Sequence, residues 1–296
     1  MWSILQSTRP HTLALSVSSI LTGTFLARSQ GFFSWPVFIL LLSTACLLQI
    51  LSNLVNEWGD WKKGTDRNQP GRKALSLQSG KMTEKQLMTV IIVVAGLASI
   101  SGLTLIRVAL GAFTHTVPIL FICLGAVALA AAVFYSAGRS PYGYRGGGDV
   151  SVFLFFGLTG VAGSYYLLAH SLDPDVLYIA GAMGMLITAV LNVNNIRDFE
   201  NDKRYGKHTF AILLSRISGT GSTFPAKIYQ LLLILFALVL SVMFAQRSGY
   251  GTFMFLISLP LLIVHLIWVR KRNGAALDGA LKMLIAAIFV YALSLF

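Results

Sequence analysis

Long apolar runs, each close to the length that crosses a bilayer, recur along the whole sequence and leave little polar chain between them. An α-helix needs about 20 apolar residues to span the roughly 30 Å of hydrocarbon in a membrane. The runs of this kind are Thr12–Ala27, Trp35–Val55, Met88–Ile106, Val117–Phe134, Val150–Ala169, Leu177–Val193, Ile228–Phe244, Phe253–Val269 and Met283–Phe296. Hydrophobic residues make up 55% of the chain and charged residues 11%, which excludes an ordinary soluble domain. The sequence predicts an all-α membrane protein, one domain over residues 1–296, with nine transmembrane helices; eight is the alternative, because the last run is short unless its helix begins near Ala275.

The basic residues divide unevenly between the two sides of such a bundle. Of the 23 Lys and Arg, all but Arg28, Arg107 and Arg247 fall in the N-terminal tail or in the loops after the second, fourth, sixth and eighth runs. Basic loops stay in the cytoplasm, so we expect the N-terminus and these loops to be cytoplasmic. The net charge of +12 then faces anionic lipid head groups of the bilayer, and a nucleic-acid partner is not needed to explain it.

Acidic residues gather where two of the apolar runs end on the predicted cytoplasmic side. One window follows the second run and the other follows the sixth run; they contain Glu57, Asp60 and Asp66, and Asp198, Glu200 and Asp202. The spacing Asn56-x3-Asp60 recurs as Asn194-x3-Asp198. Two matched windows favour a functional site over the ordinary alternative, a solvated collar of charge that anchors a helix.

Helix geometry predicts how these side chains lie. Residues four apart share a face, which places Asn194, Asp198 and Asp202 on one stripe if the sixth helix continues past the membrane. Six residues separate Asp60 from Asp66, so both can face one point only if the backbone breaks between them. We expect the second helix to end near Gly64, where glycine permits such a break.

Converging carboxylates repel one another unless a cation is present, and oxygen ligands of this kind suit Mg²⁺, which completes its shell with water and substrate phosphate. Basic residues surround both windows: Lys62, Lys63, Arg67, Arg72 and Lys73 lie beside the first, and Arg197, Lys203 and Lys207 beside the second. Acidic ligands with arginine and lysine indicate a diphosphate site. The five scattered histidines argue against a histidine-rich metal site.

Two sequence segments resemble the signatures of the UbiA-type intramembrane aromatic prenyltransferases. They are "NLVNEWGDWKKGTD" at residues 53–66 and "LNVNNIRDFENDKRYGKHTFAILL" at residues 191–214, supported by "RPHT" at residues 9–12 and "YRGGGDVSVFLFFG" at residues 144–157. The likeness covers most of the chain and is greatest to the branch that prenylates 1,4-dihydroxy-2-naphthoate in menaquinone synthesis. Glu57 departs from the aspartate common after the motif asparagine, which argues against a metal role for this position.

The resemblance implies a fold and a reaction. The fold would be a nine-helix bundle in the bacterial inner membrane, with a central cavity capped by the cytoplasmic loops after the second and sixth helices. The reaction would use Mg²⁺ to ionise a polyprenyl diphosphate, whose allyl cation the aromatic ring then attacks. Asp60, Asp66, Asp198 and Asp202 would be the catalytic metal ligands. Substrates would be bound by Asn56, Lys63, Arg67, Arg72, Asn194, Arg197, Lys203 and Lys207, and Tyr144, Arg145 and Asp149 are candidates for placing the acceptor.

Other functions remain open at this point. A related enzyme could use 4-hydroxybenzoate, homogentisate or a chlorophyllide as its acceptor. A transporter is the alternative from another class, but transporters place ionisable groups near the middle of the bilayer on broken helices. The acidic windows lie at the predicted membrane edge, which favours an enzyme.

Overall fold

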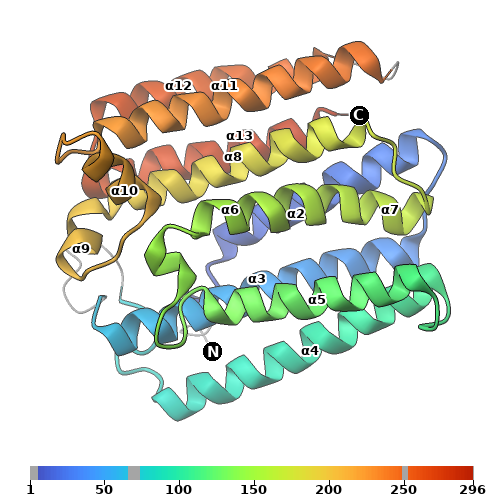
Figure 1. The fold of residues 1–296 in the computed structure, drawn as a ribbon, viewed down its shortest axis with the longest axis horizontal. Helices are drawn as coiled ribbons and strands as arrows, with labels where there is room; N and C mark the ends of the chain where they lie inside the picture. Colours follow the sequence, from blue (N-terminus) through green and yellow to red (C-terminus); the bar gives the residue numbers. More distant parts are fainter. Residues whose placement is uncertain (1–5, 66–73, 249–252, 296) are drawn as a thin grey trace.

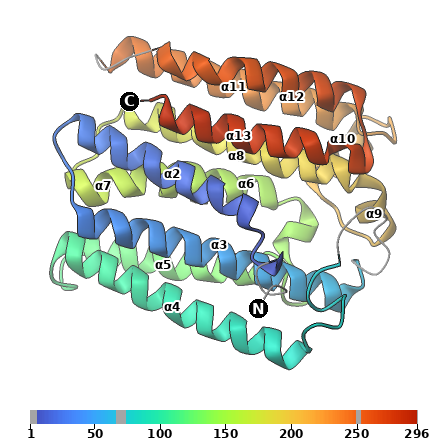
Figure 2. The same cartoon turned by 180° about the vertical axis from the view of Figure 1, so that it is seen from behind.

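The computed structural model describes residues 6–65, 74–248 and 253–295, and these ranges contain helices and turns but no strand. The long helices run side by side, with α4 (Glu84–Leu110) along one edge of the bundle and α11 (Phe224–Arg247) and α12 (Leu259–Lys271) along the other (Figures 1 and 2). The expected all-α fold is therefore confirmed.

Eight helical segments among the described residues are long and apolar enough to cross a membrane. They are α3 (Trp35–Lys63), α4, α5 (Thr116–Phe134), the segment Gly148–Ala169, α8 (Val176–Arg197), α11, the segment Phe253–Lys271 and the segment Gly274–Leu293. Three of them are composite: α6 (Gly148–Val152), η2 (Phe153–Gly163) and α7 (Ser164–Ala169); η3 (Phe253–Ser258) and α12; and η4 (Gly274–Leu277) and α13 (Asp278–Leu293). These segments contain the second to eighth predicted apolar runs and most of the ninth, which extends beyond the end of α13.

The first predicted run forms α2 (Pro10–Ser29), which is not among those eight segments. Hydroxyl groups lower its hydropathy, and several bind the helix's own backbone: Ser18 Oγ donates to Ala14 O at 2.7 Å and Thr22 Oγ1 donates to Ser18 O at 2.8 Å. The helix packs chiefly against α13, η2 and α3, and Figure 2 shows it on the near face of the bundle, between α13 and α3. A helix side that packs against protein, like the one with the buried Ser18 and Thr22, tolerates small polar side chains better than a lipid-facing side.

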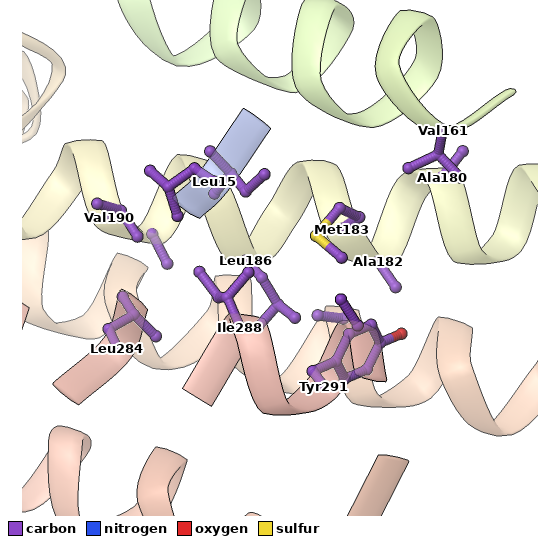
Figure 3. Packing of buried hydrophobic residues seen from close by; sticks show 14 of the residues in the cluster. Leu15, Val161, Ala180, Ala182, Met183, Leu186, Val190, Leu284, Ile288 and Tyr291 are labelled. Atoms are coloured by element: carbon purple, nitrogen blue, oxygen red, sulfur yellow. The ribbon is translucent and has the colours of Figure 1, made fainter. Parts of the chain in front are cut away.

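Helix α8 is the most deeply buried of the spanning segments. Its neighbours are α11 on one side, η2 on another and α13 on a third. Figure 3 shows Met183 and Leu186 of α8 beside Ile288 and Tyr291 of α13, with Leu15 of α2 nearby. All these side chains are buried. The position of the C-terminal end of α8 is thus fixed by packing on several sides.

The π-helical segment η2 packs unusually close to α8 through glycine. A Cβ added at Gly157 would lie 2.6 Å from Ala180 O and 2.7 Å from Gly184 Cα. The wider turn of a π-helix is rare and is often found at functional sites. Here it faces a cavity on one side and α8 on the other.

Three short helices, η1 (Tyr142–Arg145), α9 (Phe199–Arg204) and α10 (Phe210–Ile217), follow α5 and α8. They lie at the end of the bundle where α3 and α8 terminate (Figure 1). We call this end the acidic end, because it holds the described members of both acidic windows, Asp60, Asp198 and Asp202 among them. The predicted residues Asp66, Arg67 and Arg72 lie outside the described residues.

Candidate active site

The first acidic window lies on the last turns of α3. This helix ends at Lys63, and Gly64 follows it with φ 72°, the left-handed conformation that glycine adopts without steric cost. The amide of Thr65 returns to Asp60 O at 3.1 Å. The predicted break near Gly64 is confirmed, and the carboxylate of Asp60 is left buried just before it.

The second acidic window spans a break between two helices. Helix α8 ends at Arg197, Asp198 has φ −94° and ψ 7°, and α9 begins at Phe199. The amides of Asp198 and Asp202 nevertheless bond one turn back, to Asn194 O at 2.9 Å and Asp198 O at 2.8 Å. The sixth span therefore does not continue as one straight helix, yet the predicted one-turn spacing of these residues is kept.

Lys207, from the chain after α9, joins the two windows. Its Nζ lies 2.9 Å from Asp60 Oδ1 and 3.8 Å from Asp202 Oδ1. Burial alone would lower the pKa of Lys207, but Asp60 and Asp202 raise it, so the lysine stays charged. Burial raises the pKa of Asp202 to about 7, against the attraction of Lys207. Two buried carboxylates thus share one cation.

Tyr144 of η1 organises the same cluster. Its hydroxyl donates to Asp60 Oδ1, and its ring has Lys63 Nζ 4.0 Å and Lys207 Nζ 4.6 Å from the centroid. Cation–π contacts of this kind hold an ammonium group in place. We call Asp60, Lys63, Tyr144, Asp202 and Lys207 the acid–lysine cluster.

Asp198 has a different cation. Arg197 donates to the Asp198 carboxylate through Nε at 3.0 Å and through one terminal nitrogen at 2.9 Å. The other terminal nitrogen of Arg197 donates to Asp278, at the start of α13, at 2.9 Å. Burial raises the pKa of Asp198, while the guanidinium of Arg197 lowers it. Arg197 therefore ties the end of α8 to α13, a contact that the sequence analysis did not predict.

An apolar cavity of about 340 Å³ begins beside the acidic end and runs between the helices. Its wall includes residues from Leu41 to Asn56 on α3, a rise of about 22 Å at 1.5 Å per residue. Asn56 and Asn194, the two motif asparagines, line it, and Asn56 Oδ1 accepts from Ser136 Oγ at 2.9 Å. Two of the predicted site residues, Asn56 and Asn194, thus belong to the cavity wall.

The remaining predicted residues lie elsewhere. Arg145 and Lys203 are exposed. Asp149 is buried at the start of α6, in contact with Tyr229 of α11, and is not among the residues that line the cavity. Glu57 is also buried, and its Oε1 accepts from Ser76 Oγ at 2.7 Å and from the amide of Leu77 at 2.9 Å. Glu57 thus holds the chain that leads into α4.

Sequence reasoning missed a polar section of the cavity wall formed by Arg9, Thr12, Gln49 and Asn53. Asn53 Nδ2 donates to Thr12 Oγ1 at 2.9 Å, and Gln49 Nε2 donates to Thr12 Oγ1 at 3.2 Å. The signal was present, because Gln49 and Asn53 are amide side chains four residues apart inside an apolar run.

The acidic residues of this end are candidate ligands for a metal ion. Among the described residues, no three side chains of His, Cys, Asp or Glu gather as a group that could hold a metal ion. The oxygen atoms of Asp60 and Asp202 still fit a divalent cation. Both carboxylates are buried, and both lie close to one positive charge, the ammonium group of Lys207.

The chain resembles known proteins in both sequence and fold. The UbiA prenyltransferase family matches residues 16–290. The 1,4-dihydroxy-2-naphthoate octaprenyltransferase of Escherichia coli is 40% identical over 271 residues, which are 90% of this chain and 85% of that protein. The enzyme of the same name from Haemophilus influenzae is 38% identical over 274 residues, with 91% and 85% covered.

Solved structures share the fold at low sequence identity. An apo UbiA homologue from Aeropyrum pernix has a TM-score of 0.70 at 15% identity, with 95% of this chain and 96% of that chain covered. A UbiA homologue from Archaeoglobus fulgidus bound to DMAPP and Mg²⁺ has a TM-score of 0.63 at 14% identity, with 99% and 98% covered. At these identities the likeness extends to the fold alone.

Proposed function

Because the chain belongs to the UbiA prenyltransferase family, we propose that it transfers a polyprenyl chain from polyprenyl diphosphate to 1,4-dihydroxy-2-naphthoate. The products are the prenylated naphthalenediol that precedes menaquinone, CO₂ and diphosphate. The observation that carries the acceptor is the 40% identity to an enzyme named for this substrate, over 90% of the chain. The junction of a buried acid–lysine cluster with an apolar cavity supports the donor.

The acid–lysine cluster is the proposed site for the diphosphate. Asp60 and Asp202, with Asp198 and with Asp66 from outside the described residues, would hold Mg²⁺, which supplies positive charge that stabilises the leaving diphosphate. Lys63 and Lys207 bind phosphate oxygens from the same side. Tyr144 orients Asp60 through its hydroxyl and fixes both lysines over its ring. Groups held in place before substrate arrives stabilise developing charge most effectively.

The apolar cavity is the proposed site for the first part of the prenyl chain. Its lining excludes water from the allyl cation that forms as the C1–O bond breaks. The electron-rich ring attacks this cation at the carbon that bears the carboxylate. The carboxylate then leaves as CO₂, and the electron pair of its C–C bond returns to the ring and restores aromaticity.

The proposed placement in the membrane follows the charge asymmetry. We assign the acidic end to the cytoplasm of a bacterial cell, since all but three of the 23 Lys and Arg lie on that side. We also count α2 as a ninth span, because its 20 residues have the required length and the helix packs against α13, η2 and α3. Its hydroxyl groups meet protein rather than lipid.

The acceptor can be tested with carboxyl-labelled 1,4-dihydroxy-2-naphthoate and an unlabelled prenyl diphosphate. We expect one volatile label per prenyl chain transferred, and no product from 4-hydroxybenzoate, whose prenylation replaces a ring hydrogen and keeps the carboxylate. Lipid product that retains the label would contradict the proposed acceptor chemistry. Unchanged turnover in EDTA would contradict the metal.

A further inference from the structure

The part of the cavity wall formed by α2, α3 and the residue before α2 contains a small polar section in otherwise apolar surroundings. Thr12 of α2 accepts from both Gln49 and Asn53 of α3, at 3.2 and 2.9 Å, and Gln49 Nε2 also lies 3.3 Å from Asn53 Oδ1. Both amide nitrogens are therefore used within the wall. The oxygen Oε1 of Gln49 remains available to accept a hydrogen bond from a group in the cavity.

Arg9 completes this section at the cytoplasmic side. It lines the same cavity. Burial raises the pKa of Asp198, and Arg9 is one of the cations that lower it, after Arg197 and Lys207, so the charge of Arg9 also acts on the acidic end. Its backbone has φ 47°, a left-handed conformation that is uncommon for residues other than glycine. Thr12 Oγ1 donates to Arg9 O at 2.9 Å and Asn53 Nδ2 donates to Thr8 O at 2.8 Å. The wall itself thus fixes the backbone on both sides of Arg9.

Three other described cations at the acidic end have partners within the protein. Lys207 contacts Asp60 and Asp202, Lys63 lies over Tyr144, and Arg197 lies between Asp198 and Asp278. Arg9 combines a position on the cavity wall with a guanidinium for which no ion pair is found within residues 6–65, 74–248 and 253–295, although its charge acts on Asp198. A partly buried arginine of this kind is suited to bind a planar anion in the cavity.

We propose that Arg9 binds the carboxylate of the aromatic acceptor and that Gln49 Oε1 accepts from its neighbouring hydroxyl. This inference rests on the proposed function and deepens it. The reaction brings two anionic groups to the protein, a diphosphate and a carboxylate. The diphosphate is matched by the acid–lysine cluster, and the prenyl chain is uncharged. The carboxylate is the remaining anion, and Arg9 with Gln49 can recognise it together with an ortho hydroxyl.

The assignment differs from the expected acceptor residues, which lie in η1 and at the start of α6. Tyr144 belongs to the acid–lysine cluster, Arg145 is exposed, and Asp149 is outside the cavity lining. An acceptor held by Arg9 lies on the α2–α3 wall, in the same cavity as Asn56 and Asn194. Its ring can thus approach the allylic carbon from the cavity while diphosphate leaves on the cluster side.

The test measures binding by fluorescence to the purified full-length protein, with 1-hydroxy-2-naphthoate and 1-naphthol as probes that differ only in the carboxylate. We expect Arg9→Gln to weaken binding of the carboxylated probe roughly 10- to 100-fold and binding of 1-naphthol less than about twofold, as for loss of a charge-assisted hydrogen bond. Arg9→Lys should recover part of the loss. Gln49→Leu should weaken both probes, because both carry the hydroxyl.

The matched control is Arg28→Gln at the other end of α2, where the guanidinium lies over the Phe33 ring, 5.4 Å from its centroid. It should leave both affinities unchanged. In steady-state assays, Arg9→Gln should raise the KM for the acceptor and leave the KM for prenyl diphosphate unchanged. Equal weakening of both probes, or a rise confined to the KM for prenyl diphosphate, would overturn the assignment.

Failure of the proposed function would look different. A wild-type protein that binds 4-hydroxybenzoate but neither naphthalene probe has another acceptor class. The same comparison, made with 4-hydroxybenzoate and phenol, then tests Arg9. The role of Arg9 is overturned, whatever the acceptor, if the wild-type protein binds each carboxylated probe no more tightly than the matching probe without the carboxylate. The two pairs are 1-hydroxy-2-naphthoate with 1-naphthol and 4-hydroxybenzoate with phenol.

Discussion

Asp60 is the residue at which three separate parts of the chain meet. It belongs to α3, accepts from Tyr144 of η1 and pairs with Lys207 from the chain after α9. Spacing within one helix could predict that Asp60 and Asn56 share a face. It could not predict which lysine would reach Asp60, because Lys207 comes from a connection whose path depends on the whole bundle.

We expect Asp60→Asn and Asp202→Asn each to lower prenyl transfer roughly 100-fold or more. Each substitution removes a negative charge that would otherwise balance the charges of the metal ion and of Lys207. Folding should be kept, since asparagine has almost the same shape. The measurement is incorporation of radiolabelled prenyl diphosphate, with membrane insertion followed in parallel. The control is Asp175→Asn, whose partner Arg247 is largely exposed. Full activity in either cluster variant would show that the acidic windows only anchor helices.

Glu57 offers a second test at this scale. It lies in the first acidic window, but its hydrogen bonds are with Ser76 and Leu77 and not with the acid–lysine cluster. We expect Glu57→Ala to lower the free energy of unfolding by about 2–4 kcal/mol, since Ser76 Oγ and the amide of Leu77 lose their buried acceptor. Glu57→Gln keeps the oxygen and should cost much less. Thermal unfolding in detergent checks the stabilities. The Mg²⁺ concentration for half-maximal activity should be unchanged in Glu57→Gln, and a large shift would make Glu57 a metal ligand.

At the scale of elements, the apolar runs located the helices well because length and hydropathy are properties of each segment alone. The π-helical η2, the break at Asp198 and the short α9 and α10 were not predicted. These features depend on neighbours: Gly157 of η2 is pressed against α8, and Arg197 reaches across to Asp278. Local sequence carries little information about such contacts.

The contact of η2 with α8 leads to a prediction for Gly157→Ala. The added methyl group would meet backbone atoms of Ala180 and Gly184, so we expect a loss of about 1–3 kcal/mol in the free energy of unfolding. Activity should fall as well, because α8 carries Asn194 and ends at Asp198. Gly96→Ala in α4 is the matched control, since no atom lies within 4 Å of its added Cβ. Equal melting temperatures for the two variants would contradict the close packing.

At the scale of the whole molecule, the asymmetry of basic residues predicts the orientation that cysteine labelling can measure. Ser222, between α10 and α11, and Ser171, after α7, are exposed near opposite ends of the bundle. We expect a membrane-impermeant maleimide to label Ser171→Cys in intact cells and Ser222→Cys only after permeabilisation. The natural Cys46 and Cys123 lie within helices α3 and α5 and serve as the unlabelled background. The reverse pattern would place the acidic end outside the cytoplasm.

The length of the cavity has a consequence for the donor. Along α3 it extends about 22 Å, whereas a chain of eight isoprene units, as in the name of the Escherichia coli relative, exceeds the ~30 Å hydrocarbon core when extended. The protein therefore encloses only the isoprene units nearest the diphosphate, and the rest of the chain must lie among the lipids. A donor with more units would present the same enclosed portion, so we expect the cavity not to distinguish donors that differ only in the length of the tail.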